Sequence, residues 1–234
     1  MIPKKIHYVW VGGKGKPKDI KKCMKTWLPH LKDYEIIEWN EKNFDISSHP
    51  FCKAAYDAKK WAYVSDYIRA YVIYNEGGIY LDTDVLILDS FDRFLNHRAF
   101  VGFENPKFPF TAVFGAEKHH PLLKSILKHY DDLEKYSFNF EDNNTILVSD
   151  ILIDEFGCKI GNEYQELKDG IVVYPDNILC NPSKDSVSIH VFTGTWLEGK
   201  KPIARKINKF LKLNINTKKK AEIFAKYITN RGNK

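Results

Sequence analysis

The chain has 234 residues, 44% of them hydrophobic, and a formal charge of +6; this length and apolar content predict one packed domain and exclude an intrinsically disordered protein. Its four cysteines are widely separated and form no Cys-x-x-Cys pair, which excludes a disulfide framework and a zinc site and favours reduced thiols in a cytoplasm. Because no uncharged apolar run reaches about eighteen residues and the N-terminus lacks the hydrophobic region of a signal peptide, we expect a protein that is neither exported nor membrane-spanning.

The first quarter of the sequence has the pattern of a βαβ unit. Residues 6–11 are β-branched and aromatic and end at Gly12-Gly13, which predicts a buried strand followed by a loop that a ligand can approach closely. Apolar residues at helical spacing predict a helix over 17–28, and a second strand is predicted over 34–39. A long helix with room for one break is predicted over 51–74.

Two glycines, Gly77 and Gly78, predict the end of that helix, and a short strand follows at 79–81. This strand delivers Asp82 and Asp84 at its end, and an extended pattern resumes at 85–88. The remaining predicted elements are the strands 99–103, 111–115, 170–174 and 187–192 and the helices 121–136 and 145–156. Alternating strands and helices predict a mostly parallel sheet flanked by helices, a fold in which ligands bind beyond the carboxyl ends of the strands.

Asp82 and Asp84 are the candidate metal ligands. Two carboxylates two residues apart on an extended backbone point the same way and can share one hard cation. An exposed acidic turn is the alternative interpretation, because Asp-x-Asp alone is a weak motif.

The residues around this motif form longer blocks. Residues 63–85 contain Ser-Asp-x-x-Arg followed by Gly-Gly-x-Tyr-x-Asp-x-Asp, residues 2–10 read IPKKIHYVW, and residues 190–196 read HVFTGTW. In these three blocks the chain resembles the family 32 glycosyltransferases and, more distantly, the glucosyltransferase domains of large clostridial toxins. The resemblance implies a retaining transferase in a single GT-A, Rossmann-like domain with a mixed sheet, placed here at residues 1–199 and followed by a basic helical tail at 200–234.

The resemblance also implies roles for individual residues. Ser65, Asp66 and Arg69 contact the nucleotide-sugar donor, Asp82 meets donor hydroxyls and the metal, and Asp84 ligates Mn²⁺ or Mg²⁺ directly. Because Asp66 and Arg69 are three residues apart on a helix, they share a face, and an intrahelical ion pair is the alternative role for them.

Further donor contacts are expected from Val9, Trp10, Tyr80 and Trp196. Trp10 can stack on a nucleobase, and the Tyr80 hydroxyl, on the same strand face as Asp82, can reach the sugar. For both tryptophans an ordinary core position is the alternative. The resemblance implies that His190 is a third metal ligand or a diphosphate contact, whereas a lone histidine on a strand is usually structural.

The charge of the chain is concentrated at its end. Residues 200–234 contain twelve Lys or Arg and one acid, Glu222, which gives them a net charge of +11 and leaves −5 for residues 1–199. Because apolar residues lie among the lysines, we expect this basic tail to bind an anionic membrane surface, peripherally at the inner face; a solvated terminal helix is the alternative. Nucleic acid is disfavoured as a partner because no known binding module is present and the core is acidic.

The predicted function is therefore transfer of a hexose from a nucleotide sugar, with a UDP-sugar as the predicted donor, to a glycan or lipid-linked acceptor in capsular or related polysaccharide synthesis. A metal-dependent nucleotidyltransferase or phosphohydrolase is the competing enzyme class, but a complete Gly-x-x-x-x-Gly-Lys-Ser/Thr phosphate-binding loop and an Asp-x-Asp-x-Thr nucleophile are both missing. A non-catalytic nucleotide-sugar-binding protein is the third possibility.

Overall fold

The computed structural model describes residues 1–133, 135, 136, 138, 144–194 and 203–232. Its strands are β1 (Lys5–Val9), β2 (Glu35–Trp39), β3 (Gly78–Leu81), β4 (Val85–Ile87), β5 (Ala99–Gly102), β6 (Val113–Ala116), β7 (Gln165–Glu166), β8 (Ile171–Tyr174) and β9 (Ser188–His190). Its α-helices are α1 (Lys18–Met24), α2 (Trp27–His30), α3 (Pro50–Asp57), α4 (Trp61–Glu76), α5 (Pro121–Asp131), α6 (Asn144–Asp154), α7 (Asp176–Leu179), α8 (Ile203–Lys212) and α9 (Lys218–Gly232).

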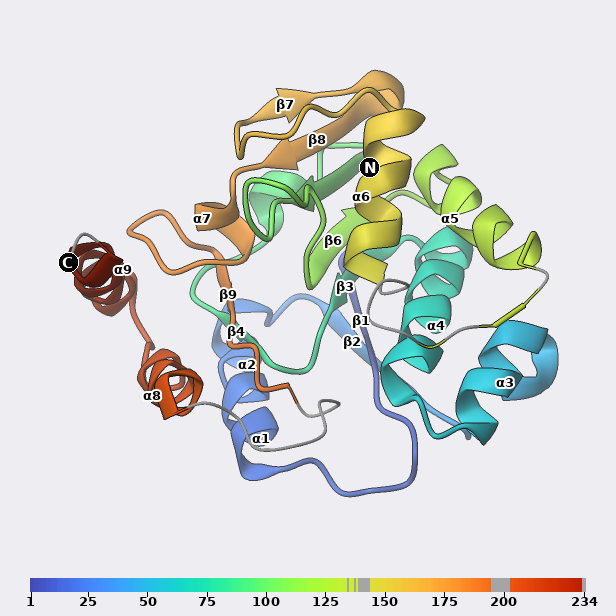
Figure 1. Ribbon diagram of the computed structural model, residues 1–234, viewed down its shortest axis with the longest axis horizontal. Helices are drawn as coiled ribbons and strands as arrows, with labels where there is room; N and C mark the ends of the chain where they lie inside the picture. Colours follow the sequence, from blue (N-terminus) through green and yellow to red (C-terminus); the bar gives the residue numbers. More distant parts are fainter. Residues whose placement is uncertain (134, 137, 139–143, 195–202, 233–234) are drawn as a thin grey trace.

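Seven strands form a mixed sheet in the order β2-β1-β3-β6-β5-β8-β7 (Figure 1). β1 pairs in parallel with β2 and β3, and β5 pairs in parallel with β8, whereas β6 runs antiparallel to both of its neighbours and β7 antiparallel to β8. The prediction of a mostly parallel sheet was therefore wrong. The chain runs from β3 through β6 without an α-helix, and a parallel pairing needs a long crossover, usually helical. The mixed α/β fold itself is confirmed.

Helices cover both faces of this sheet. One core lies under α3, α4, α5 and α6, and the other lies against α1, α2 and α7 (Figure 1). Strand alternation divides the side chains of β3 between the two cores: Tyr80 faces the first, and Ile79 and Leu81 face the second. Because β3 is fully buried and lies between β1 and β6, its neighbours hold its carboxyl end, which precedes Asp82, in a fixed position.

The helix predicted over 51–74 is interrupted between α3 and α4. The N–H of Lys60 donates to Ala55 O and the N–H of Lys59 donates to Tyr56 O, while Lys59 adopts a φ of 57°. These two bonds and the left-handed residue form a Schellman motif, which closes a helix C-terminus. Glycine usually occupies the left-handed position, so a lysine there gave no signal of where the break falls.

The end of α4 is where the two glycines predicted it. Gly77 caps the helix with a φ of 67°, and Gly78, with a φ of 113°, begins β3. A Cβ on Gly78 would lie 2.8 Å from Lys5 O and 2.9 Å from Nε2 of His7, so both the backbone angle and the space require glycine. This tight junction positions the strand that carries Asp82.

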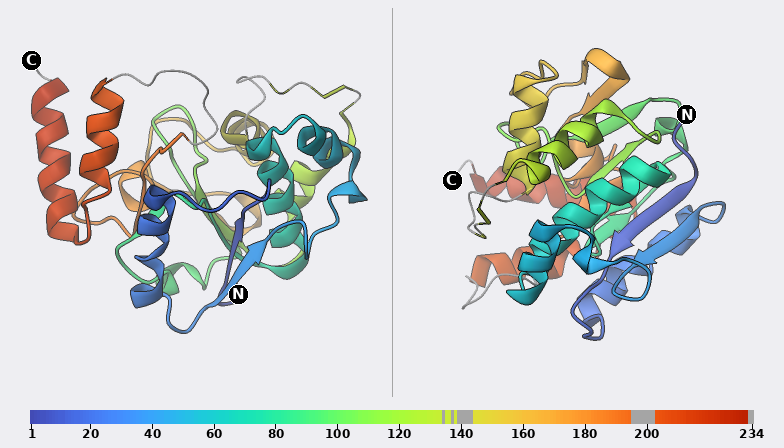
Figure 2. Two further views of the ribbon diagram at one scale, coloured as in Figure 1. Left: turned by 90° about the horizontal axis from the view of Figure 1, so that it is seen from below. Right: turned by 90° about the vertical axis from the view of Figure 1, so that its right-hand side faces the viewer.

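A second, two-stranded sheet joins β4 to β9 in antiparallel pairing. Leu86 and Ile189 of this sheet form a third apolar cluster with Leu213, Ile215 and Ala221 from the basic tail. Figure 2 shows α8 and α9 lying lengthwise beside each other, at the opposite end of the molecule from α3 and α4. The described part of the tail is thus packed on the rest of the chain. No helix in the described ranges has both the length and the hydrophobicity needed to cross a bilayer.

His7, in β1, is fully buried, and its two partners define its protonation state. Trp39 Nε1 donates to Nδ1 at 3.0 Å, so the proton of the neutral ring is on Nε2, which donates to Gly77 O at 2.9 Å. Burial lowers the pKa of His7 from 6.5 to about 4, although the bond to Gly77 opposes this. Protonation would also abolish the acceptor that Trp39 uses.

The lowered pKa of His7 makes the fold sensitive to acid. The folded state binds this proton less well than the unfolded state, so the contribution is fully present above pH 6.5 and is lost as the pH falls toward 4. It amounts to about 3 kcal/mol over that window. We expect the difference in unfolding free energy between wild type and His7→Gln, measured by urea denaturation, to shrink by that amount on acidification. A difference independent of pH would contradict this assignment.

Candidate active site

Asp82 and Asp84 lie in the turn between β3 and β4. The turn is fixed by its backbone: Asp82 N–H donates to Ala112 O at 3.0 Å, and Val85 N–H donates to Asp82 O at 3.1 Å. The two carboxylates are partly exposed, in contrast to the buried strands on either side. They therefore lie in an accessible turn that links the seven-stranded sheet to the two-stranded one.

Asp84 is held by the segment that follows β9. Its Oδ2 accepts from the Thr193 N–H at 2.8 Å and from the Thr193 hydroxyl at 3.0 Å, and its Oδ1 lies 3.3 Å from Nε2 of His190. Burial alone would raise the pKa of Asp84, but the charge of His190 and the bonds from Thr193 outweigh it and hold the pKa well below the ordinary value. Asp84 is therefore a carboxylate at neutral pH.

His190 reaches Asp84 through the pairing of β4 with β9, in which it lies opposite Val85. The backbone carbonyl of His190 accepts from Nζ of Lys212, in α8, at 2.8 Å. The ring of Phe192 packs on the imidazole with centroids 3.8 Å apart, and Phe192 has a φ of 60°. Burial would lower the pKa of His190, but the Asp84 carboxylate raises it well above its usual range.

Asp82 belongs to a second network, built on α4. Its Oδ1 lies 3.1 Å from Nη2 of Arg69 and accepts from the Tyr80 hydroxyl at 3.1 Å. The same Arg69 nitrogen pairs with Asp66 at 3.0 Å and donates to Ser65 Oγ at 2.8 Å, and the guanidinium lies 4.4 Å from the centroid of the Tyr80 ring. Arg69 thus connects the predicted helix residues to the predicted metal site.

Asp66 and Arg69 are both buried, and this sets their electrostatics. Burial raises the pKa of Asp66 to about 7, although the charge of Arg69 opposes the shift. The intrahelical pair considered from the sequence is present, but Arg69 also pairs with Asp82, so the pair is part of the site. Tyr80 is buried as well, and its hydroxyl is engaged with Asp82. Its contact with a sugar remains a prediction.

Asp82, Asp84 and His190 can hold a metal ion. One ligand atom from each lies within 4.8 Å of the others. Two carboxylates and an imidazole suit Mn²⁺ or Mg²⁺, with the remaining positions left for phosphate oxygens or water. The ring nitrogen of His190 that faces the Asp84 carboxylate is Nε2, so this is the atom that the imidazole can offer to a cation once it has lost its proton. The residues present therefore fit a divalent cation.

Val9 is the last residue of β1 and Trp10 follows it; because β1 is the parallel neighbour of β3, both lie at the same end of the strands as Asp82. Trp10 borders a cavity of about 630 Å³ that Gly12, Glu38 and Tyr56 also line. Its Nε1 donates to Lys14 O at 2.6 Å, and the ring is partly exposed, whereas Val9 is buried. Its volume lies within the range of small-molecule sites in general. Trp196 lies outside the described residues.

Several site residues were not found from the sequence. Thr193 and Phe192 lie inside the quoted block 190–196, which was the only signal for them. Lys212 comes from the tail, and Glu104 follows β5; burial raises the pKa of the Glu104 carboxyl, and charges of His190, Asp82 and Lys212 act on it. No local pattern marks these two residues, because tertiary packing brings them to the site.

Part of the chain that includes this region is similar to a known family of domains. Residues 17–101 match the model of the glycosyltransferase sugar-binding region containing a DXD motif. This segment includes the helix and strand that carry Asp66, Arg69, Asp82 and Asp84. The chain is also 29% identical over 143 residues to inositol phosphoceramide mannosyltransferase 3 of Schizosaccharomyces pombe, an alignment that covers 59% of this chain and 39% of that protein. The chain thus spans about two fifths of the length of that relative.

Two solved glycosyltransferases have the same fold. PaToxG glycosyltransferase aligns with a TM-score of 0.50 and 20% identity over 66% of this chain and 70% of its own. A glycosyltransferase involved in the glycosylation of the major capsid of PBCV-1 aligns with a TM-score of 0.50 and 12% identity over 90% of this chain and 99% of its own. The fold is of the GT-A type, as predicted.

Proposed function

We propose that the protein is a metal-dependent, retaining glycosyltransferase that moves a hexose from a UDP-sugar to a glycan or lipid-linked acceptor. The observation that carries the proposal is the convergence of Asp82, Asp84 and His190 within 4.8 Å at the tip of β3, inside a segment that matches a sugar-binding region. The mannosyltransferase name of the yeast relative supports a hexose as the transferred group and a phosphoceramide lipid as one kind of acceptor.

Each site residue has a role in this reaction. Asp82, Asp84 and His190 would hold the cation, which when bound stabilises the negative charge that builds on the departing diphosphate. Arg69 orients Asp82 through their ion pair and, with Asp66, would contact the donor. Tyr80 prevents rotation of the Asp82 carboxylate by donating to it. Thr193 fixes Asp84 through two hydrogen bonds, so the site is preorganised before the donor binds.

Transfer proceeds with retention of configuration by a same-face displacement. The bond from the anomeric carbon to the diphosphate oxygen breaks, and the acceptor oxygen bonds to the same face of that carbon. The acceptor proton moves to the leaving diphosphate. NMR of the product anomer tests this step: an α-linked donor should give an α-linked product, and a β-linked product would overturn the retaining mechanism.

The activity is tested by hydrolysis of a panel of UDP- and GDP-sugars with and without Mn²⁺, because a glycosyltransferase commonly transfers some donor to water. Release of free hexose and UDP that depends on Mn²⁺ is expected. Release of a nucleoside monophosphate and a sugar phosphate would instead identify a phosphohydrolase, and saturable binding without turnover would identify a non-catalytic binder.

We also propose that the basic tail attaches the enzyme to the inner face of an anionic membrane, where surface polysaccharides are assembled. Support comes from its net charge of +11 and from exposed Ile207, Phe210 and Ile223 on α8 and α9.

We expect Ile207→Ser/Phe210→Ser to release the protein from vesicles containing phosphatidylserine in a flotation assay, with donor hydrolysis unchanged. Substitutions are preferred to a deletion because these side chains are exposed. Deleting the tail would instead expose Leu86 and Ile189, which pack against it. Equal vesicle binding by the double variant would refute the membrane role of this face.

A further inference from the structure

Glu104 lies at the same end of the sheet as Asp82. β3 and β5 each pair with β6 in antiparallel fashion, so they run in the same direction and their carboxyl ends lie at one end of the sheet. Asp82 comes directly after β3, and Glu104 is the second residue after β5. Because ligands of α/β sheets bind beyond the carboxyl ends of the strands, Glu104 is placed where a ligand of this domain is expected.

The backbone of Glu104 is held by hydrogen bonds, whereas its carboxylate is not. The Glu104 N–H donates to Phe108 O at 2.9 Å, and the Glu104 carbonyl accepts from Nδ2 of Asn181 at 3.3 Å. The side chain is half-buried, and within the described ranges its carboxylate has no hydrogen bond and no ion pair. Burial raises the pKa of this carboxyl. Because withdrawing a carboxylate from water without a donor costs free energy, a ligand that donates to it would offset that cost.

Thr111 is a second polar side chain without a partner at this end of the sheet. It is 2% exposed, and among the described residues its Oγ1 has no hydrogen-bond partner. Thr111 directly precedes Ala112, whose carbonyl accepts from the N–H of Asp82 at 3.0 Å. Because buried hydroxyl groups in folded proteins are usually hydrogen-bonded, the unused capacity of Thr111 also points to a ligand.

The chemistry of Glu104 suits a neutral group with hydroxyls. The charges of His190 and Asp82 act on its carboxyl, so Glu104 borders the candidate metal centre. It is not part of the group of ligand atoms that lie within 4.8 Å of one another there. A carboxylate repels a diphosphate and accepts hydrogen bonds from sugar hydroxyls. Glu104 is therefore suited to the sugar part of a donor and unsuited to its phosphates.

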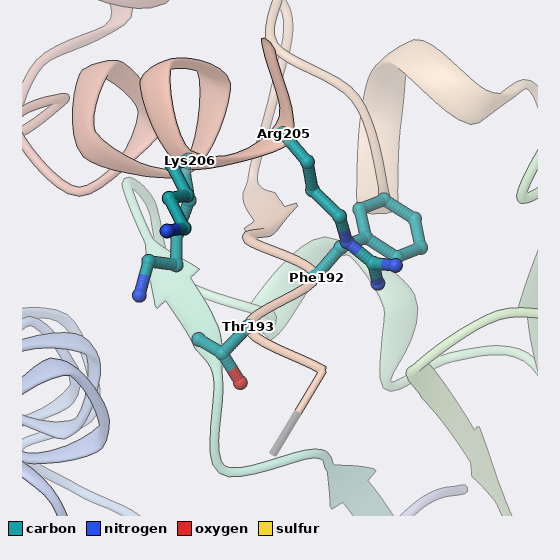
Figure 3. A pocket seen from close by; sticks show the side chains of 5 residues that line it. Phe192, Thr193, Arg205 and Lys206 are labelled. Atoms are coloured by element: carbon teal, nitrogen blue, oxygen red, sulfur yellow. The ribbon is translucent and has the colours of Figure 1, made fainter. Parts of the chain in front are cut away.

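The surroundings of the metal centre leave the β5 side for the sugar. Trp10 and the cavity beside it lie at the end of β1, which is on the opposite side of β3 from β5. On the tail side, Figure 3 shows Arg205 and Lys206 of α8 beside Thr193, around a cavity of about 240 Å³. This side is basic and suits phosphate oxygens. A nucleotide sugar with its base near Trp10 and its diphosphate at the metal centre would extend its hexose toward β5.

We infer that Glu104 and Thr111 bind hydroxyl groups of the donor hexose and that Glu104 determines which hexose is accepted. This inference rests on the proposed transferase function and names residues that recognise its sugar. The Glu104 carboxylate accepts a hydrogen bond from one hexose hydroxyl, and the Thr111 hydroxyl makes a second contact. An epimer whose hydroxyl points elsewhere leaves the carboxylate unpaired and is bound more weakly.

The test compares sugar binding with nucleotide binding in the full chain. Isothermal titration in Mn²⁺ measures the affinity for UDP-glucose, UDP-galactose and GDP-mannose, each beside its free nucleoside diphosphate. The proteins are wild type, Glu104→Gln and the matched control Glu35→Gln. Glu35 is exposed at the start of β2, which runs parallel to β1, so it lies at the opposite end of the sheet from Glu104. Deoxy analogues of the tightest-bound donor, each lacking one hexose hydroxyl, are then titrated into the same proteins.

We expect all three proteins to bind the free nucleotide equally, and Glu104→Gln to bind the best sugar nucleotide about tenfold more weakly than wild type or Glu35→Gln. One deoxy analogue should lose the same factor in wild type and nothing further in Glu104→Gln, which identifies the hydroxyl. Urea denaturation should show Glu104→Gln to be at least as stable as wild type, because the variant lacks a half-buried charge that has no partner in the described ranges.

Unchanged affinity of Glu104→Gln for the sugar nucleotide would overturn the inference. An equal loss for the free nucleotide would do so too, because Glu104 would then serve the diphosphate or the metal. Further losses for every deoxy analogue in Glu104→Gln, an equal loss in Glu35→Gln, or a clear loss of stability would also overturn it. Donor hydrolysis is measured separately. Sugar binding that depends on Glu104 without turnover would refute the transferase proposal and leave this sugar site standing.

Discussion

Replacing Asp84 by asparagine is expected to lower kcat/KM for donor turnover about a thousandfold while the protein stays folded. The amide oxygen can still accept from the N–H and hydroxyl of Thr193, so the turn between β3 and β4 keeps its shape. What is lost is the negative charge that faces His190 and that would hold the cation. The measurement is steady-state hydrolysis of the best donor in saturating Mn²⁺, with circular dichroism as the check on folding.

Asp89→Asn is the matched control for this variant. Asp89 follows the other end of β4 and pairs with Lys218, outside the candidate site. The same chemical change there should leave kcat/KM near the wild-type value, because exposed ion pairs contribute little. Full activity of Asp84→Asn, or an equal loss in both variants, would contradict the role assigned to Asp84.

The second large effect is expected at Arg69, and it concerns stability as well as activity. Arg69→Met removes the only cation placed between the buried Asp66 and Asp82 in the described part of the chain, so two carboxylates lose their partner. Breaking a buried ion pair from one side costs about 3–5 kcal/mol. We expect urea denaturation to show a loss of that order and donor turnover to fall below detection.

A double variant separates the two effects. In Asp66→Asn/Arg69→Met no unpaired charge is left at the fully buried position, so part of the lost unfolding free energy should return while turnover stays absent. A double variant less stable than Arg69→Met alone would contradict the electrostatic explanation. Recovery of turnover would show that Arg69 only stabilises the fold and does not serve the donor.

The residues near Asp82 were largely predictable because they are local in sequence. Asp66 and Arg69 share a helix face by their spacing, and the glycines after α4 predict the strand that carries Asp82 and Asp84. The contacts of Arg69 with Asp82 and with Tyr80 link the two segments, and they need only the short return from α4 to β3. This half of the site therefore follows from residue spacing and turn signals that can be read locally in the sequence.

The other half of the site was less predictable because it depends on long-range pairing. β4 and β9 are three residues each and separated by about a hundred residues, so no periodicity indicates that they pair with each other and leave the main sheet. That pairing brings His190 and Thr193 to Asp84. Lys212, which supports His190, belongs to a tail whose charge predicted a solvent- or membrane-facing role. The packing of the tail on β4 and β9 could be learned only from the structure.

The central claim, that Asp82, Asp84 and His190 hold a divalent cation beside the donor diphosphate, is tested most directly by anomalous diffraction from crystals grown with Mn²⁺ and UDP. The account predicts an anomalous peak in contact with the Asp84 carboxylate, within the Asp82, Asp84 and His190 cluster, and coordinated by diphosphate oxygens. A manganese ion bound to UDP with its protein ligands elsewhere, or UDP bound with no ion at this cluster, would contradict it.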